Sequence, residues 1–356
     1  MRARADAEMP KPIPDPNVQV STQDLIGLRR RAEGLRLTAR EPTRSVLAGG
    51  HRSPFRGRGM DYQESRHYQP GDDIRNMDWR ITARAGRPHV KLYEEERERP
   101  VIVLADLGPS MFFGTRGAFK SVAAARLAAL IGWAAIARGD RIGALIFGGG
   151  SGRSLTSSNP SANPPSNPGV ANGGRRELQP AGGRRAVMRL IRDLALVGDA
   201  EAGRATTTAS GGLTAALARL RRVVRPGSLV FVISDFHSRD ADSERHLGQL
   251  RRHSEVVACQ IADALELAPP PPGRYGIGDG RRTGVLDVRP TQARQRYADY
   301  FASHHAAVAA MTKAHGIPLI RLSPEDDPVA RLAQGLELRL AGRRRPRRAT
   351  GVGVAA

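Results

Sequence analysis

The chain has little of the chemistry that marks secreted or membrane proteins. Cys259 is the single cysteine among 356 residues, so no internal disulfide forms, which is typical of a reducing compartment. The longest apolar run, Leu127 to Ala137, is about half of the roughly 20 residues that a membrane span needs. The first residues carry charges and prolines without an apolar stretch, unlike a signal peptide. The sequence therefore predicts a cytoplasmic protein with no membrane span.

Common catalytic motifs are also absent. The sequence contains no G-x-S-x-G, no Walker loop and no H-E-x-x-H, and Cys259 falls inside an expected buried strand. A metal-dependent hydrolase that uses Asp106 and Asp235 is an alternative, but it lacks a recognisable base. These absences favour a non-enzymatic binding or scaffold protein.

Positive charge is abundant, with a formal net charge of +21. A basic field of this size attracts polyanions, so an Arg-rich nucleic-acid-associated protein is the alternative function. However, 52 of the 56 basic residues are arginine and the chain is rich in Ala, Gly and Pro, as expected from a genome-wide compositional bias. This bias makes nucleic acid the secondary rather than the leading partner.

The two ends of the chain differ in composition from its centre. Residues 1–20 carry prolines at 10, 12, 14 and 16, which predicts a disordered tail, and residues 341–356 form a basic disordered tail. Ser21 and Asp24 have the spacing of a capping box, so a helix is expected to begin there. Residues 21–99 are predicted to form this helix together with a small N-terminal α+β subdomain.

From residue 100 onward, strand and helix patterns alternate. The strands are apolar on both faces, which indicates a mostly parallel sheet covered by helices on two sides. Residues 100–340 therefore predict a doubly wound α/β domain. Its expected strands span residues 101–106, 141–147, 228–236, 254–263 and 317–322, and its expected long helices span 117–140 and 291–316.

Two segments interrupt this alternation. Residues 148–183 are rich in Gly, Ser, Pro and Asn and are predicted to form a flexible insertion, because they bury too little apolar surface to become ordered. Residues 268–288 are expected to form a loop and a small hairpin.

Polar side chains follow two of the expected strands. Asp106 and Asp235 each come directly after a buried run, and ligands bind at the carboxyl ends of parallel strands. Asp106 and Ser110 could offer a carboxylate and a hydroxyl to a hard cation such as Mg²⁺. The alternative is that these residues cap the helices that follow.

The stretch from His67 to Arg99 has a dense set of turn and charged residues. Pro70 and Gly71 form a tight-turn dipeptide, and Asp72 or Asp73 would cap a short helix over residues 73–84. The spacing of Ile74, Met77 and Ile81 predicts one apolar helix face. Trp79 is expected to anchor a core, and Asp78 is expected to join Arg66, Arg75 and Arg84 in a structural ion-pair network.

Residues 100–236 resemble a von Willebrand factor A-type domain. The metal-ion-dependent adhesion site of that family has D-x-S-x-S after the first strand, and this chain matches it at Asp106, Ser110 and Asp235 but has Gly108 in place of the first Ser. Thr206, Thr207 and Thr208 lie near the position of the family's Thr ligand. The resemblance implies a degenerate adhesion-type metal site that docks a carboxylate of a partner.

The sequence also resembles the bacterial domain-of-unknown-function family 58. Its pattern R-x-Y-x-P-G-D-D-x-R-x-I-D-W-x-x-x-A-R is matched over residues 66–84, with Met77 replacing Ile. The resemblance implies a partnership with a MoxR-type AAA+ ATPase in chaperone-like assembly or maturation of a protein client. The matching residues are Arg66, Tyr68, Pro70, Gly71, Asp72, Asp73, Arg75, Asp78, Trp79, Ala83 and Arg84.

Overall fold

A computed structural model of the chain describes residues 15–37, 60–70, 72–95, 99–148, 175–198, 212–278 and 283–343. Gly71, Thr206, Thr207 and Thr208, together with most of both tails, lie outside these ranges. The chain divides into two compact units. One comprises residues 39–98, and the other comprises residues 1–38 and 99–356.

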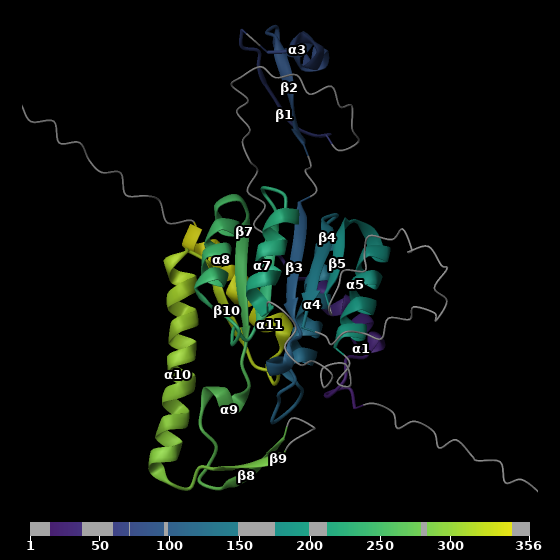
Figure 1. Cartoon of the computed structure of the whole chain (residues 1–356). Coiled ribbons are helices and arrows are strands. Elements are labelled where there is room, and N and C mark those ends of the chain that lie inside the picture. The colour runs from purple at the N-terminus through teal and green to yellow at the C-terminus, as the bar shows by residue number, and fades with distance from the viewer. Residues whose placement is uncertain are drawn as a thin grey trace, which may run out of the picture. The chain divides into compact units, whose positions relative to one another are not determined.

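The larger unit is built on one sheet, as the sequence predicted. Its strand order is β10-β7-β6-β3-β4-β5, and every neighbouring pair is parallel except β4 and β5 (Figure 1). The five predicted strands are all present. The strands are β3 (Pro100–Asp106), β4 (Arg141–Phe147), β5 (Arg176–Ala181), β6 (Leu229–Ser234), β7 (Glu255–Ile261) and β10 (Leu319–Leu322).

Both faces of this sheet are covered by helices, which explains why its strands are apolar throughout. Alternate residues of β3 enter different cores: Val101 and Val103 belong to one cluster, and Ile102 and Leu104 belong to the other. The first cluster is completed by α1 (Thr22–Gly27), α2 (Arg29–Ala32), α4 (Lys120–Ile136), α5 (Gly183–Val197) and α11 (Pro328–Arg343). The second is completed by α7 (Gly212–Val223), α8 (Ala241–His253) and α10 (Thr291–Ala314).

The last part of the predicted flexible insertion is ordered. Within residues 148–183, strand β5 pairs antiparallel with β4, so the prediction is wrong for this part. The pairing satisfies the backbone groups along the β4 edge and so offsets the weak apolar content of β5. Residues 149–174 of the insertion lie outside the described residues.

The N-terminal helices belong to the α/β unit and not to the small unit, which corrects the boundary expected at residues 21–99. Leu25 is fully buried, and its carbonyl accepts a hydrogen bond of 3.0 Å from Trp133 Nε1 on α4. Arg126 Nε lies 2.7 Å from Asp24 Oδ2. Ser21 stands at the N-cap of α1, but its side chain makes no capping hydrogen bond. Apolar packing on α4, more than local capping, therefore holds this segment.

The small unit consists of the antiparallel pair β1 (Met60–His67) and β2 (His89–Glu95), the 3-10 turn η1 (Ile74–Asn76) and α3 (Trp79–Ala85). The single helix predicted over residues 73–84 is split, because Asp78 accepts hydrogen bonds from the backbone of Arg80 and Ile81 and starts a new helix. This new start turns Trp79 outward. Its exposed fraction is 67%, so the predicted core anchor is wrong. Ile74 is 61% exposed, whereas Met77 and Ile81 are partly buried, so the predicted apolar face forms only in part.

The ion pairs observed in the small unit also differ from the predicted network. Arg66 pairs with Asp72 at 2.7 Å, and Asp72 also accepts from the backbone N–H of Gln69, which lowers its pKa. Asp78 accepts a hydrogen bond of 2.9 Å from Ser65 Oγ in addition to its backbone donors. Because capping already uses its oxygens, Asp78 does not form the predicted arginine contacts within the described residues.

Four short elements complete the larger unit. The predicted hairpin within residues 268–288 is confirmed as β8 (Arg274–Gly278) and β9 (Thr283–Asp287). The short helix α9 (Ala264–Leu267) follows β7, and the 3-10 turn η2 (Pro109–Met111) follows β3. Over the described ranges, every helix is too short or too polar to cross a membrane.

The substitution Leu25→Ala tests the packing of the N-terminal helix. Because this fully buried side chain contacts the main core, its truncation is expected to lower the free energy of unfolding by about 3 kcal/mol. Chemical denaturation monitored by circular dichroism measures the change. Leu196→Ala on α5, where the side chain is 49% exposed, is the matched control and should change stability little. Equal effects of the two substitutions would contradict the observed packing.

Candidate functional site

Four ionisable side chains meet at the carboxyl edge of the parallel sheet. Asp106 is the last residue of β3, and Asp235 directly follows β6, which lies beside β3. Glu266 belongs to α9, which follows the next strand, β7. Lys120 opens α4. Parallel neighbours bring these strand ends to one edge, as the sequence predicted for Asp106 and Asp235.

Lys120 lies at the centre of this group, with its side chain only 1% exposed. Its Nζ is 2.9 Å from Asp235 Oδ2 and 2.6 Å from Glu266 Oε1. Burial alone would lower the pKa of Lys120, but the two carboxylates raise the pKa by more, so the side chain stays an ammonium ion. A buried charge needs such partners because its desolvation penalty is several kcal/mol.

Asp106 is almost completely buried beside this ion pair. Its Oδ1 accepts from the backbone N–H of Gly108 at 2.9 Å, and its Oδ2 accepts from Ser234 Oγ at 2.6 Å. Burial and the nearby charge of Asp235 raise the pKa of Asp106 to about 7. A Cβ at position 108 would lie 3.0 Å from Asp106 Oδ1, so glycine allows this tight turn. The glycine that departs from the adhesion-site pattern thus has a local structural reason.

The backbone after β6 is strained. Phe236 has φ of +60°, a left-handed conformation that non-glycine residues seldom adopt. Its N–H donates to Ser234 Oγ at 2.9 Å, and its side chain is fully buried, so packing holds the strain. This turn directs Asp235 toward Lys120, and Asp235 Oδ1 accepts from the backbone of His237 at 3.0 Å.

Glu266 is fixed by the cap of its own short helix. Asp263 caps α9 and accepts from Thr115 Oγ1 at 2.6 Å, while its N–H donates to Glu266 Oε2 at 2.9 Å. Burial would raise the pKa of Glu266, but His237, Lys120 and the Asp263 N–H together lower it to about 2. Glu266 is therefore ionised at neutral pH.

Three histidines surround the charged group. His304 Nε2 donates to the carbonyl of Asp235 at 2.9 Å, and its ring stacks on His237 with centroids 4.1 Å apart. His305 Nε2 donates to the carbonyl of Glu266 at 3.1 Å, so its Nδ1 accepts from Gln260. Burial is the main cause that lowers the pKa of both His304 and His305, so both rings are neutral at pH 7.

The donor set fits an ammonium ion and does not fit Mg²⁺. Ser110, one of the predicted ligands, is exposed, whereas Asp106 is buried. Lys120 Nζ occupies the space beside Asp235 where a divalent ion would have to bind. Among the residues that the structure describes, no three His, Cys, Asp or Glu side chains form a metal-binding group. The possible ligands Thr206, Thr207 and Thr208 lie outside these residues.

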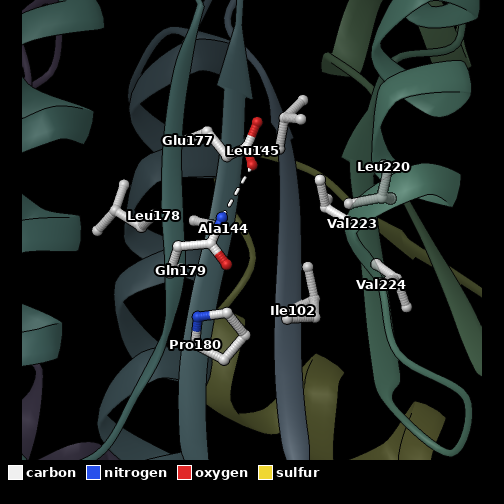
Figure 2. A pocket seen from close by; sticks show the side chains of 10 residues that line it. All are labelled: Ile102, Ala144, Leu145, Glu177, Leu178, Gln179, Pro180, Leu220, Val223 and Val224. Atoms are coloured by element: carbon white, nitrogen blue, oxygen red, sulfur yellow. Dashed lines mark hydrogen bonds between the residues drawn. The ribbon is translucent and has the colours of Figure 1, made fainter. Parts of the chain in front are cut away.

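Two hollows in the surface of the larger unit differ in size and lining. Figure 2 shows the one between β5 and α7, which is lined by apolar side chains such as Ile102, Leu220 and Val223. Its volume is about 10 Å³, room for about one water molecule. The second is open, has a volume of about 350 Å³ and lies beside the charged group. It is lined by His237, Arg239, Tyr300, Ser303 and His304.

The Asp106 environment predicts a pH dependence. With a folded pKa of about 7 against an ordinary value of 3.8, Asp106 keeps a proton in the folded state that it loses in the unfolded state, so rising pH destabilises the fold across this window. The substitution Asp106→Asn removes this pH-dependent contribution to the free energy of unfolding. From pH 4 to pH 7, wild type should lose on the order of 3 kcal/mol relative to the variant.

Thermal denaturation at several pH values measures this difference. Asp299→Asn, which changes an exposed carboxylate on α10, should leave the wild-type pH profile unchanged. Parallel profiles for wild type and Asp106→Asn would contradict the protonated state of Asp106.

Comparisons with solved structures give distant similarities. BatB from Bacteroides thetaiotaomicron is 12% identical, with a TM-score of 0.40 over 69% of this chain and 99% of that chain. A von Willebrand factor type A structure from Catenulispora acidiphila is also 12% identical, with a TM-score of 0.31 over 70% of this chain and 43% of that chain.

Sequence comparisons find relatives with higher identity to this chain than the solved structures have. An uncharacterized protein of Mycobacterium tuberculosis is 31% identical over 310 residues, which cover 86% of this chain and 88% of the relative. Residues 64–159 and 170–307 match the family described as "Protein of unknown function DUF58". The motif over residues 66–84 and the strands β3, β4, β5, β6 and β7 of the larger unit lie within these matched ranges, whereas β10 lies beyond them. The chain belongs to the DUF58 family.

Proposed function

We propose that this chain is a non-enzymatic, cytoplasmic scaffold protein that binds a protein partner at the carboxyl edge of its parallel sheet. It acts with a MoxR-type AAA+ ATPase in the assembly or maturation of a protein client. The family resemblance of the motif over residues 66–84 suggests this ATPase as the partner. The hollow beside the charged group is the observation that carries the proposed docking site.

The hollow is suited to an anionic side chain. Arg239 contributes a permanent positive charge, and its Nε is enclosed without a hydrogen-bond partner among the described residues. The hydroxyls of Ser303 and Tyr300 also line the space. A guanidinium group binds a carboxylate through paired hydrogen bonds, so a Glu or Asp side chain of the partner is the expected ligand.

The chemistry of the edge supports binding more than catalysis. The Asp106 oxygens are enclosed by Gly108 and Ser234, and Lys120 is held by two carboxylates, so neither group has access to a substrate. Burial raises the pKa of the Cys259 thiol to about 12, which leaves it protonated and unreactive. The Ser234 hydroxyl, which lies beside Asp106, is fully buried, so this edge offers no accessible nucleophile beside a base among the described residues.

Arg239→Glu tests the docking site. Reversal of this charge should repel a partner carboxylate and weaken binding to the purified MoxR-type ATPase from the same genome by about tenfold or more. Co-purification and a binding titration measure the effect. Arg252→Glu is the matched control, because Arg252 is exposed near the end of α8 that leads into the start of β7, at the opposite edge of the sheet.

Two outcomes would contradict the proposal. Absence of a complex with wild type would exclude this ATPase as the partner, and an equal loss in both variants would indicate general attraction to positive charge. Nucleic acid as the true partner would instead show affinity that falls steeply with salt and that depends on residues 342–356 but not on Arg239.

A further inference from the structure

We infer that the ammonium group of Lys120 is the resident cation of the carboxyl edge, and that this edge binds its ligands without a divalent metal ion. It follows from the position of Lys120, from the donors that occupy the carboxylates, and from the charge of the cluster.

The position of Lys120 is built into the fold. It is the first residue of α4, and its backbone N–H donates to the carbonyl of Phe113 at 2.9 Å, so the loop before the helix fixes the start of the side chain. The ammonium group lies 5.7 Å from the centre of the Phe113 ring, which adds a cation–π contact. An aromatic ring on one side and carboxylates on the other enclose the charge.

Every oxygen of the three carboxylates already accepts a hydrogen bond. Asp106 receives Gly108 N–H and Ser234 Oγ, as described above. Asp235 receives the His237 N–H on Oδ1 and Lys120 on Oδ2. Glu266 receives Lys120 on Oε1 and the Asp263 N–H on Oε2. A divalent ion at Asp235 Oδ2 or Glu266 Oε1 would have to compete with the ammonium group of Lys120, which already contacts both oxygens.

The charges also disfavour a second cation. Lys120 supplies one positive charge to Asp235 and Glu266, and His237 Nε2 lies 3.6 Å from Glu266 Oε1. An added Mg²⁺ would lie beside an ammonium ion in a site of low dielectric, where like charges repel strongly. The ammonium ion therefore takes the place that a metal ion holds in an adhesion-type site.

Metal titration of the full chain tests this inference directly. Calorimetry with Mg²⁺ and Mn²⁺ should detect no binding at the edge, and neither ion nor a chelator should shift Tm. Asp106→Asn is the reference variant, because it keeps the shape of the site but removes a predicted metal ligand. Saturable binding to wild type that Asp106→Asn abolishes would overturn the inference. Binding that persists in Asp106→Asn but is lost in Asp235→Asn would overturn it as well, and binding that persists in both variants would arise elsewhere.

Substitution of Lys120 tests the same idea through stability. Lys120→Met keeps the side-chain volume but leaves Asp235 and Glu266 without their cation, so Tm should fall by roughly 10 °C. The triple variant Lys120→Met, Asp235→Asn, Glu266→Gln removes all three charges and should recover most of this loss.

Lys313→Met on α10, where the lysine is exposed, is the matched control and should leave Tm unchanged. A single Lys120→Met variant that melts like wild type would overturn the inference. Failure of the single variant to fold agrees with it only if the triple variant folds, and a triple variant that also fails would contradict the role of charge.

Discussion

One enclosed ion pair network determines the geometry of the carboxyl edge. Lys120 at the start of α4 is shared by Asp235 after β6 and Glu266 in α9. Because an unpaired charge at this depth would be strongly destabilising, the three elements are held in one relative position. The strained backbone at Phe236 and the stacking of His237 on His304 follow from that position. The open hollow therefore rests on a rigid base, which suits a docking surface better than a mobile one.

Much of the fold could be predicted from the sequence, because long apolar strands and periodic helices carry strong local signals. The exceptions are instructive. Strand β5 is held by backbone pairing with β4, and its residues Arg176–Ala181 show no apolar alternation. In the small unit, Asp78 caps a new helix that begins at Trp79, and the Trp79 side chain is exposed. The spacing of apolar residues predicts one continuous helix here, and it does not show that a capping side chain interrupts that helix.

Only two of the four residues of the candidate site could be predicted from the sequence. Asp106 and Asp235 follow buried strands, which is a signal that the sequence carries. Lys120 and Glu266 carry no such signal, since the lysine lies 115 residues from Asp235 and 146 residues from Glu266. At the start of a helix, a lone lysine also resembles an ordinary solvated residue. The adhesion-site pattern specifies only oxygen ligands for a metal ion, so it does not predict a cation supplied by the chain itself.

The division of the chain has a consequence for its synthesis on the ribosome. Residues 39–98 interrupt the larger unit, so Leu25 is made 108 residues before its partner Trp133. At ordinary translation rates this separation corresponds to roughly 5–20 s, during which the apolar N-terminal segment has no core to join. The hairpin of the small unit is local in sequence and emerges complete within this interval. Nascent chains of this protein therefore expose an apolar segment early, and its burial has to wait for α4.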